Sequence, residues 1–421
     1  MTALVSVAAP ARVSRRAMAA ATLILFGLID IFLFGLFAHK GDATFAFTVS
    51  GTSVHVPSIQ AAATPVAYVL GAISVAIGML RAVTDPSALV KRLSIGVVLL
   101  CFVISLLCWA YAGNAIPLNV VNLLQSTLNL SIPLVLGALA GCMCERSGVI
   151  NIAIEGQLLI GAFAAAVVAS AFGALWLGLV TGSLAGGLVG LVLATFAIRF
   201  LVDQIILGVV LNVLASGLTG YLNDRILVTR PDLNTGLTFN AVKIPGLGDI
   251  PIIGPIFFDS TIFLYIMYAM IILVQVGLFS TKWGLRVRAV GEHPTAAETV
   301  GIRVLATRYR NVIMGGLIAG IGGAYLTIGS VGTFSKDMSS GLGYIALAAM
   351  IFGRWTPLGA TAAALLFGFA NSLQATLSTI NVPISSYFLL MAPYVATIIA
   401  VAGLVGRVRA PAADGKPYVK A

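Results

Sequence analysis

Charged residues are scarce in this sequence. Asp, Glu, Lys and Arg make up only 9% of the 421 residues, whereas they make up about 25% of an ordinary soluble protein. Hydrophobic residues reach 59%, and they occur in runs near the roughly 20 residues that a helix needs to cross a bilayer. The shortage of charge therefore excludes a water-soluble globular protein and predicts an integral membrane protein.

Cysteine and histidine are also rare. The four cysteines form no C-x-x-C pair and fall within or beside apolar runs, so we interpret them as small buried residues: Cys101, Cys108, Cys142 and Cys144. The three histidines lie far apart along the chain. We therefore expect no metal site, and no spacing of His, Cys and carboxylate residues indicates an enzyme.

The chain lacks a phosphate-binding loop. Such a loop reads Gly-x-x-x-x-Gly-Lys-Ser/Thr, but the only Gly-Lys pair, Gly415-Lys416, is followed by Pro417. We expect no ATP hydrolysis and no cofactor in this chain. A pump built from it would need a partner subunit that hydrolyses ATP, or an ion gradient.

The apolar runs predict an all-α, polytopic bundle of about 10–12 transmembrane helices. Leu342–Gly353 is too short for an upright span and Gln204–Leu222 carries Asn212, so either is a candidate for a re-entrant or broken segment. The expected spans are 19–37, 62–80, 93–112, 120–141, 150–172, 175–198, 204–222, 261–279, 311–330, 342–353, 357–376 and 387–405.

Lys and Arg set the expected orientation, because cytoplasmic loops collect them. With twelve crossings, most of the 24 Lys and Arg fall on the side of the N-terminus, so both termini are expected to be cytoplasmic. The net charge of +10 is then mainly a topology signal that also suits an anionic leaflet, and we expect no nucleic-acid partner.

The chain divides into four regions on this interpretation. Residues 1–92 form an N-terminal extension with two spans, 93–406 the core, 281–309 a cytoplasmic loop within that core, and 407–421 a basic cytoplasmic tail. Small residues also recur four apart, as in Gly182/Gly186/Gly190 and Gly316/Gly320, which predicts close helix packing.

Polar side chains inside the spans are the candidates for a substrate path. Glu155 follows Asn151 by four residues, so the two are expected to share a helix face. The other members are amides, which suit a neutral ligand rich in hydroxyl, carbonyl and ring-nitrogen groups but also join helices to one another. The candidates are Gln125, Asn129, Asn151, Glu155, Asn212, Asn371 and Gln374.

The large basic loop carries a second signal. Its stretch from Gly291 to Gly301 has a proline suited to a first helical turn and ends at a glycine, which is common just past a helix end. It therefore predicts a short amphipathic helix lying across the membrane face.

Several motifs resemble a known family. ERSGVINIAIEGQLLIGAF, Glu145 to Phe163, resembles the signature of bacterial importer permeases of the branched-chain amino acid and simple-sugar class. VGEHPTAAETVGI, Val290 to Ile302, is similar to the loop of that class that contacts the ATPase. LAAMIFGRWTPLGATAAALLFG, Leu347 to Gly368, and IPGLGDIPIIGPIFF, Ile244 to Phe258, are similar to the branch that transports nucleosides.

The resemblance implies an ATP-binding-cassette importer in the bacterial inner membrane. Such a machine has two permease subunits, ATPase subunits that bind the ATP, and an extracytoplasmic binding protein. The irregular loop Asn223–Asp259 is either a docking surface for that protein or a plain connector. The residues expected to couple the chain to the ATPase are Arg286, Arg288, Gly291, Glu292, Pro294, Ala296, Ala297, Glu298 and Gly301.

Other functions stay open at this point. Within the same class of machine, the substrate could instead be a simple sugar or a branched-chain amino acid. An ion-coupled secondary carrier is disfavoured by the scarcity of acidic residues deep in the spans, where such carriers place them.

Overall fold

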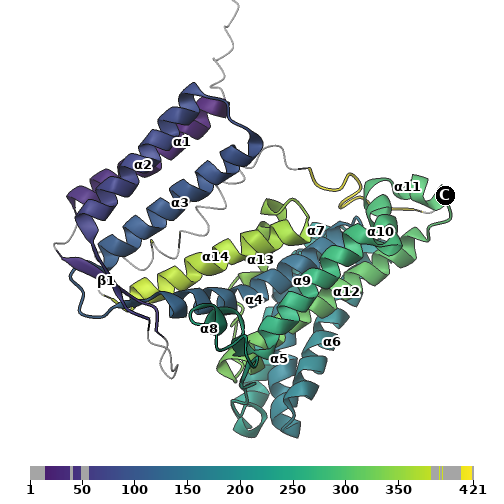
Figure 1. Cartoon of the computed structure of the whole chain (residues 1–421). Helices are drawn as coiled ribbons and strands as arrows, with labels where there is room; N and C mark the ends of the chain where they lie inside the picture. The colour runs from purple at the N-terminus through teal and green to yellow at the C-terminus, as the bar shows by residue number, and fades with distance from the viewer. Residues whose placement is uncertain are drawn as a thin grey trace, which may run out of the picture. The chain divides into compact units, whose positions relative to one another are not determined.

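The computed structural model describes residues 15–37, 41–48, 56–380, 388, 391 and 409–419. It divides into two compact units, Met1–Val121 and Asn122–Ala421, each of which has its own packing. Figure 1 shows the elements of both units.

The first unit contains three long helices and a small sheet. The helix α1 ends in the π-helical turn η1, and α2 packs against both α1 and α3. The strands pair in the order β2-β1-β3. The elements are α1 Arg15–Ile29, η1 Asp30–Leu36, β1 Asp42–Ala46, β2 Ile59–Ala62, α2 Ala63–Val83, α3 Ala88–Tyr111 and β3 Leu118–Asn119.

The boundary between the units falls later than the expected division after residue 92. The reason is packing: α3 contacts α2 and β1, and β3 continues the same sheet by pairing with β1. Three helices therefore belong to the first unit, where the sequence analysis assigned two.

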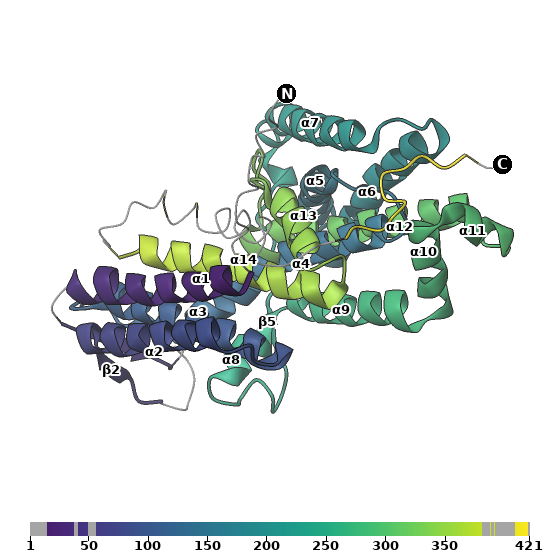
Figure 2. The same ribbon diagram turned by 90° about the horizontal axis from the view of Figure 1, so that it is seen from above.

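The second unit is a helical bundle (Figure 2). Its short strands β4 and β5 pair with each other. Its elements are α4 Val120–Glu145, α5 Ile154–Phe172, α6 Leu175–Ala194, η2 Thr195–Arg199, α7 Gln204–Leu222, η3 Asn223–Leu227, η4 Pro231–Leu233, β4 Ala241–Lys243, α8 Ile253–Phe257, β5 Asp259–Thr261, α9 Ile262–Ser280, α10 Lys282–Glu292, α11 Pro294–Thr299, α12 Val304–Ala324, η5 Tyr325–Val331, α13 Leu342–Phe352 and α14 Pro357–Ser378.

The described residues include ten helices that are long and apolar enough to cross a membrane. This confirms the predicted all-α, multi-pass membrane fold. One of the ten is α7 with its extension η3, an unbroken run of 24 residues, so the Asn212 side chain does not interrupt it. The expected span 387–405 lies outside the described residues, apart from Phe388 and Met391.

Glycines let α6 and α12 approach closely. A Cβ on Gly186 would lie 2.5 Å from the Gly316 carbonyl oxygen and 2.6 Å from the Gly320 Cα. On α12, a Cβ on Gly316 would lie 2.5 Å from the Gly186 carbonyl oxygen. The two backbones therefore touch along a glycine seam, which confirms the packing role predicted from the four-residue spacing.

The short helix α13 accompanies only half of α4. A Cβ on Gly137 would lie 2.8 Å from the Ala346 Cβ, and one on Gly141 would lie 2.7 Å from the Met350 sulfur. Since both helices rise about 1.5 Å per residue, α13 begins level with Pro133, near the middle of α4. It is thus a half-helix, and the irregular residues 332–341 precede it.

Candidate functional site

The stretch from Gly291 to Gly301 contains the predicted short helix, α11, preceded by the last two residues of α10. The first helix, α10, ends at Glu292, and the second, α11, begins at Pro294, with His293 between them. Gly301 follows α11 with a φ of +83°, a backbone conformation that glycine adopts at little cost. Gly291 is therefore the penultimate residue of α10, and α11 runs from the predicted proline to just before the predicted glycine.

Two of the expected coupling residues, Gly291 and Ala297, point inward. Gly291 is buried against the α4–α5 loop, where a Cβ would collide with the carbonyl group of Arg146. Ala297 is buried in a cluster with Val290, Val304 and Tyr418. These residues fix α10 and α11 to the rest of the second unit.

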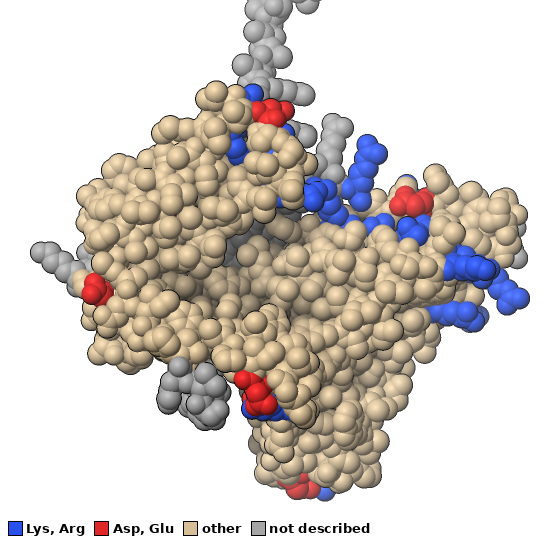
Figure 3. Space-filling model, in the orientation of Figure 1, with Lys and Arg blue, Asp and Glu red and all other residues tan. Residues whose placement is uncertain are grey.

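The other coupling residues face outward. The exposed side chains are those of Arg286, Glu292, Ala296 and the neighbouring Val300, while Pro294 and Glu298 are partly exposed. Arg288 is partly buried, with its guanidinium 5.0 Å from the centre of the Phe279 ring. We name this surface the α10–α11 face, and Figure 3 shows Lys and Arg gathered over that end of the bundle.

Residues 409–419 pack against the inner side of α10 and α11. The Ala413 N–H donates to the Gly291 carbonyl at 2.9 Å, and the Ala412 N–H donates to the Glu292 carboxylate at 3.2 Å. The hydroxyl of Tyr418, itself buried, donates to the carboxylate of Glu298. The described part of the predicted basic tail is therefore a docked segment.

The docked segment also contacts α12 and the end of α4. Arg308 of α12, which is 2% exposed, donates to the Lys416 carbonyl at 3.0 Å. The Asp414 carboxyl lies beside the buried carboxyl of Glu145, which accepts from the Trp355 indole at 2.5 Å. Burial raises the pKa of Asp414 to about 7, because the charged form loses water.

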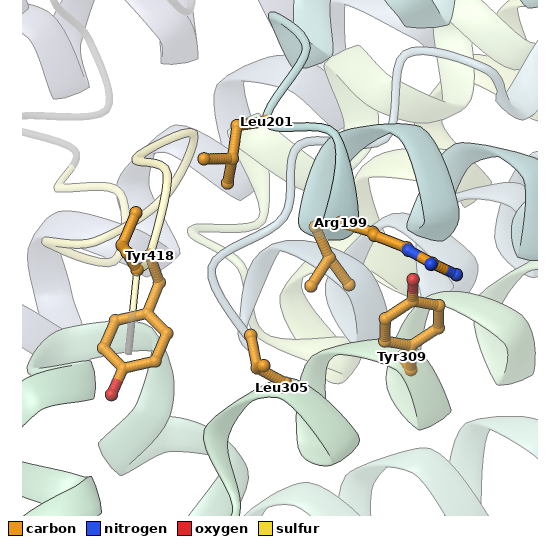
Figure 4. A pocket seen from close by; sticks show the side chains of 7 residues that line it. Arg199, Leu201, Leu305, Tyr309 and Tyr418 are labelled. Carbon is orange, nitrogen blue, oxygen red and sulfur yellow. The ribbon is translucent and has the colours of Figure 1, made fainter. Parts of the chain in front are cut away.

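A pocket of about 390 Å³ opens beside this docked segment. In Figure 4, the Arg199 guanidinium lies next to the Tyr309 hydroxyl, and Tyr418 stands across the pocket from them. The remaining lining is apolar and comes from η2, the loop after it, α12 and the docked segment: Ile198, Leu201, Leu305 and Val419.

Deeper in the bundle, Glu155 holds the start of the half-helix α13. Its carboxylate accepts from the Ser339 hydroxyl at 2.6 Å, the Gly341 N–H at 2.8 Å and the Gly343 N–H at 2.6 Å. A carboxylate at the positive end of a helix dipole is stabilising. Glu155 is thus a cap for α13 that α5 supplies.

Asn151 and Glu155 do not share a helix face, because α5 begins only at Ile154. Asn151 lies in the preceding loop and donates to the Gln157 side chain at 3.1 Å. Asn212 of α7 joins the same region, since its side chain accepts from the Gly156 N–H at 2.8 Å and donates to the Ile152 carbonyl at 2.9 Å. The structure thus brings Asn151, Glu155 and Asn212 together around the start of α5.

The other path candidates lie elsewhere. Gln125 donates to the Asp259 carbonyl at 3.0 Å, and Asn129 accepts from the Ser260 hydroxyl at 2.8 Å, so both anchor β5 to α4. Gln374 bonds to Ser378 within α14, and Asn371 is partly buried on that helix. A role of any of these residues in a substrate path stays a prediction.

Residues 123–403 match the family described as the permease component of branched-chain amino acid transport systems. The chain belongs to this permease family. The matched range starts where the second unit starts, so the first unit of this permease lies outside the family's shared core. No solved structure matches the chain significantly.

Named relatives of this permease include transporter subunits for nucleosides and for a sugar. A guanosine ABC transporter permease protein of Bacillus subtilis is 43% identical, over 71% of this chain and 96% of the relative. A nucleoside ABC transporter permease protein of Lactococcus lactis is 40% identical, over 72% and 99%. A putative glucose ABC transporter permease protein of Haloferax volcanii is 34% identical, over 60% and 77%.

Proposed function

We propose that this permease forms the membrane path of an ATP-binding-cassette importer for nucleosides. The observation that carries this proposal is the similarity to the guanosine and nucleoside permease proteins, which extends over almost their whole length. ATP is then hydrolysed by partner ATPase subunits, and this chain needs no cofactor or metal.

The α10–α11 face is the surface we propose for the ATPase. Arg286, Glu292 and Ala296 are exposed on it, while Gly291 and Ala297 hold it to the bundle. A groove on the ATPase that closes on ATP would push on the exposed residues. Because Gly291 and Ala297 are packed tightly against the bundle, α10 and α11 would move as a rigid body.

Residues in contact with one another connect the α10–α11 face to the interior of the bundle. Gly291 touches Arg146 of the α4–α5 loop, the same loop carries Asn151 next to α5, and Glu155 of α5 holds the start of α13. A rotation of α10 would therefore reach the half-helix in the middle of the bundle through packed and hydrogen-bonded groups.

The remaining partners follow from the same proposal. A second permease subunit, identical or homologous, completes the path, and an extracytoplasmic binding protein docks at the opposite end, where residues 223–259 lie. The proposed location is the inner membrane of a bacterium, with both termini and the α10–α11 face in the cytoplasm.

Uptake of radiolabelled nucleosides, sugars and branched-chain amino acids tests the proposal. Cells with and without this chain are compared, and the comparison is repeated with the neighbouring ATPase inactivated. Nucleoside uptake should disappear in both cases. Selective loss of sugar uptake would favour the alternative suggested by the Haloferax relative, and uptake that survives without the ATPase would indicate a secondary carrier.

A further inference from the structure

The irregular segment 332–341 lies at membrane depth. Its starting point follows from α12, which runs beside α4 so that a Cβ on Gly315 would lie 2.8 Å from the Ala140 carbonyl oxygen and one on Gly322 would lie 3.2 Å from the Leu136 Cβ. Continuing at one residue per 1.5 Å, η5 ends about level with residues 124–127 of α4. The segment therefore descends from there to the middle of α4, where α13 begins.

Irregular backbone at this depth is tolerated only where protein buries it or where it lines a water-filled cavity. Lys336 of this segment pairs with Asp224 beyond the end of α7, with its ammonium 2.6 Å from the carboxylate. Nearer to α13, the side chains of Asp337 and Ser340 are exposed. A charged side chain facing lipid near the centre of the bilayer is costly. Exposed polar side chains at this depth therefore favour contact with water over contact with lipid.

One face of α7 completes the polar surface. The Ser216 hydroxyl donates to the Asp337 carboxylate at 2.6 Å. One turn away, the Asn212 side-chain amide donates to the Tyr344 hydroxyl at 3.1 Å. Since Asn212 and Ser216 are four residues apart on one helix, Asp337 and Tyr344 lie next to each other along α7.

The ring of Tyr344 is held in place and yet open. Its side chain is 47% exposed, while the bond from Asn212 fixes its hydroxyl. Its backbone belongs to the first turn of α13, which Glu155 secures through Gly341 and Gly343. An aromatic face presented in this way suits a planar ring, because base–aromatic stacking is worth about 1–3 kcal/mol.

We infer that Ser216, Asp337, Ser340 and Tyr344 form a binding site for a nucleoside midway along the path. Tyr344 stacks on the base. Asp337 accepts hydrogen bonds from the ribose hydroxyls, since a carboxylate has acceptor capacity left after the bond from Ser216, and Ser340 adds a hydroxyl. This inference rests on the proposed function and names residues on the path that it requires.

The test compares guanosine with 2′,3′-dideoxyguanosine in ATP-dependent uptake by cells that carry the complete transporter. Tyr344→Leu should raise the KM for both compounds about 10-fold, whereas Tyr344→Phe, which keeps the ring, should change it less than about 3-fold. Asp337→Ala should raise the KM for guanosine only, so the preference for guanosine over the dideoxy compound should fall about 10-fold.

Tyr221→Leu is the matched control, because Tyr221 is also exposed on α7 but points to a different side of that helix. It should leave the KM unchanged. The ratio of the KM for guanosine to that for the dideoxy compound does not depend on how much transporter reaches the membrane. Variants that are produced poorly therefore remain informative. If Asp337→Ala fails to assemble, Asp337→Asn takes its place in the same comparison.

Two results would overturn the inference in distinguishable ways. The unaltered transporter could take up guanosine while the Tyr344 and Asp337 variants show unchanged KM values and KM ratios. That result would refute the site alone. Absence of any ATP-dependent nucleoside uptake by the unaltered transporter would refute the proposed function and the site together.

Discussion

At the scale of single residues, Glu155 has the clearest structural role. One carboxylate satisfies the Ser339 hydroxyl and the N–H groups of Gly341 and Gly343, and hydrogen bonds to a charged acceptor are worth more than neutral ones. Glu155→Gln should therefore lower the free energy of unfolding by about 2 kcal/mol. Thermal unfolding of the detergent-solubilised protein measures the change.

Asp203→Asn is the matched control for Glu155→Gln. Asp203 also caps a helix, by accepting from Ile205 and Ile206 at the exposed start of α7, but asparagine caps about as well as aspartate there. This variant should unfold at nearly the unaltered temperature. An equal loss in both variants would contradict the cap role assigned to Glu155.

Asp414 should make docking of residues 409–419 depend on pH. Its pKa is raised by burial to about 7 in the docked form, from 3.8 for a free aspartate. The docked form therefore binds the proton more tightly, so docking should be strongest below about pH 4, weaken as the pH rises, and stay constant above about pH 7.

Hydrogen exchange of residues 410–418, corrected for the intrinsic exchange rate at each pH, measures this docking. Asp414→Asn stays neutral at every pH and should remove most of the dependence. If the unaltered chain and this variant lose protection in parallel, another group controls the segment.

At the scale of elements, the glycine seam between α6 and α12 makes a sharp prediction. Gly316→Ala should destabilise the protein by about 1–3 kcal/mol, because the added methyl group would meet the Gly186 carbonyl oxygen at 2.5 Å and force the helices apart. Thermal unfolding measures the effect. Gly217→Ala, on α7 with open space around the added group, should be neutral or stabilise by up to about 1 kcal/mol.

The α10–α11 face allows a test of coupling without disturbing the fold. Ala296→Trp adds bulk at an exposed position of α11, so it should abolish ATP-dependent uptake while thermal unfolding stays unchanged. Ala306→Trp, at an exposed position of α12, should have a smaller effect. Normal uptake with Ala296→Trp would exclude this face as the ATPase contact.

The sequence predicted the existence of the transmembrane helices well, and the positions where those helices are interrupted poorly. Hydropathy predicts the long helices because each must satisfy its backbone internally, and glycine spacing predicts the α6–α12 seam. The break at Asn151 was not predicted, because Asn151 and Glu155 are spaced as on one helix face, whereas α5 begins only at Ile154. The contact between Ser216 and Asp337 was not predicted, because the two residues are 121 positions apart in the chain.

At the scale of the whole molecule, the orientation is open to direct measurement. The four native cysteines are buried, so they give little background with a membrane-impermeant maleimide. Thr238→Cys, in the loop 223–259, should be labelled in intact cells, whereas Ala412→Cys, in the docked segment, should react only after the cells are opened. The reverse pattern would invert the proposed topology.

The glycine seam has a consequence for motion across the whole second unit. Two helices whose backbones touch over several turns cannot slide or tilt independently. The helices α6 and α12 therefore move together as one rigid body. Both helices leave α-helical geometry only at their ends, at η2 and η5. Any rotation of this helix pair would therefore hinge at those π-helical turns. Of the two, η5 leads directly into residues 332–341.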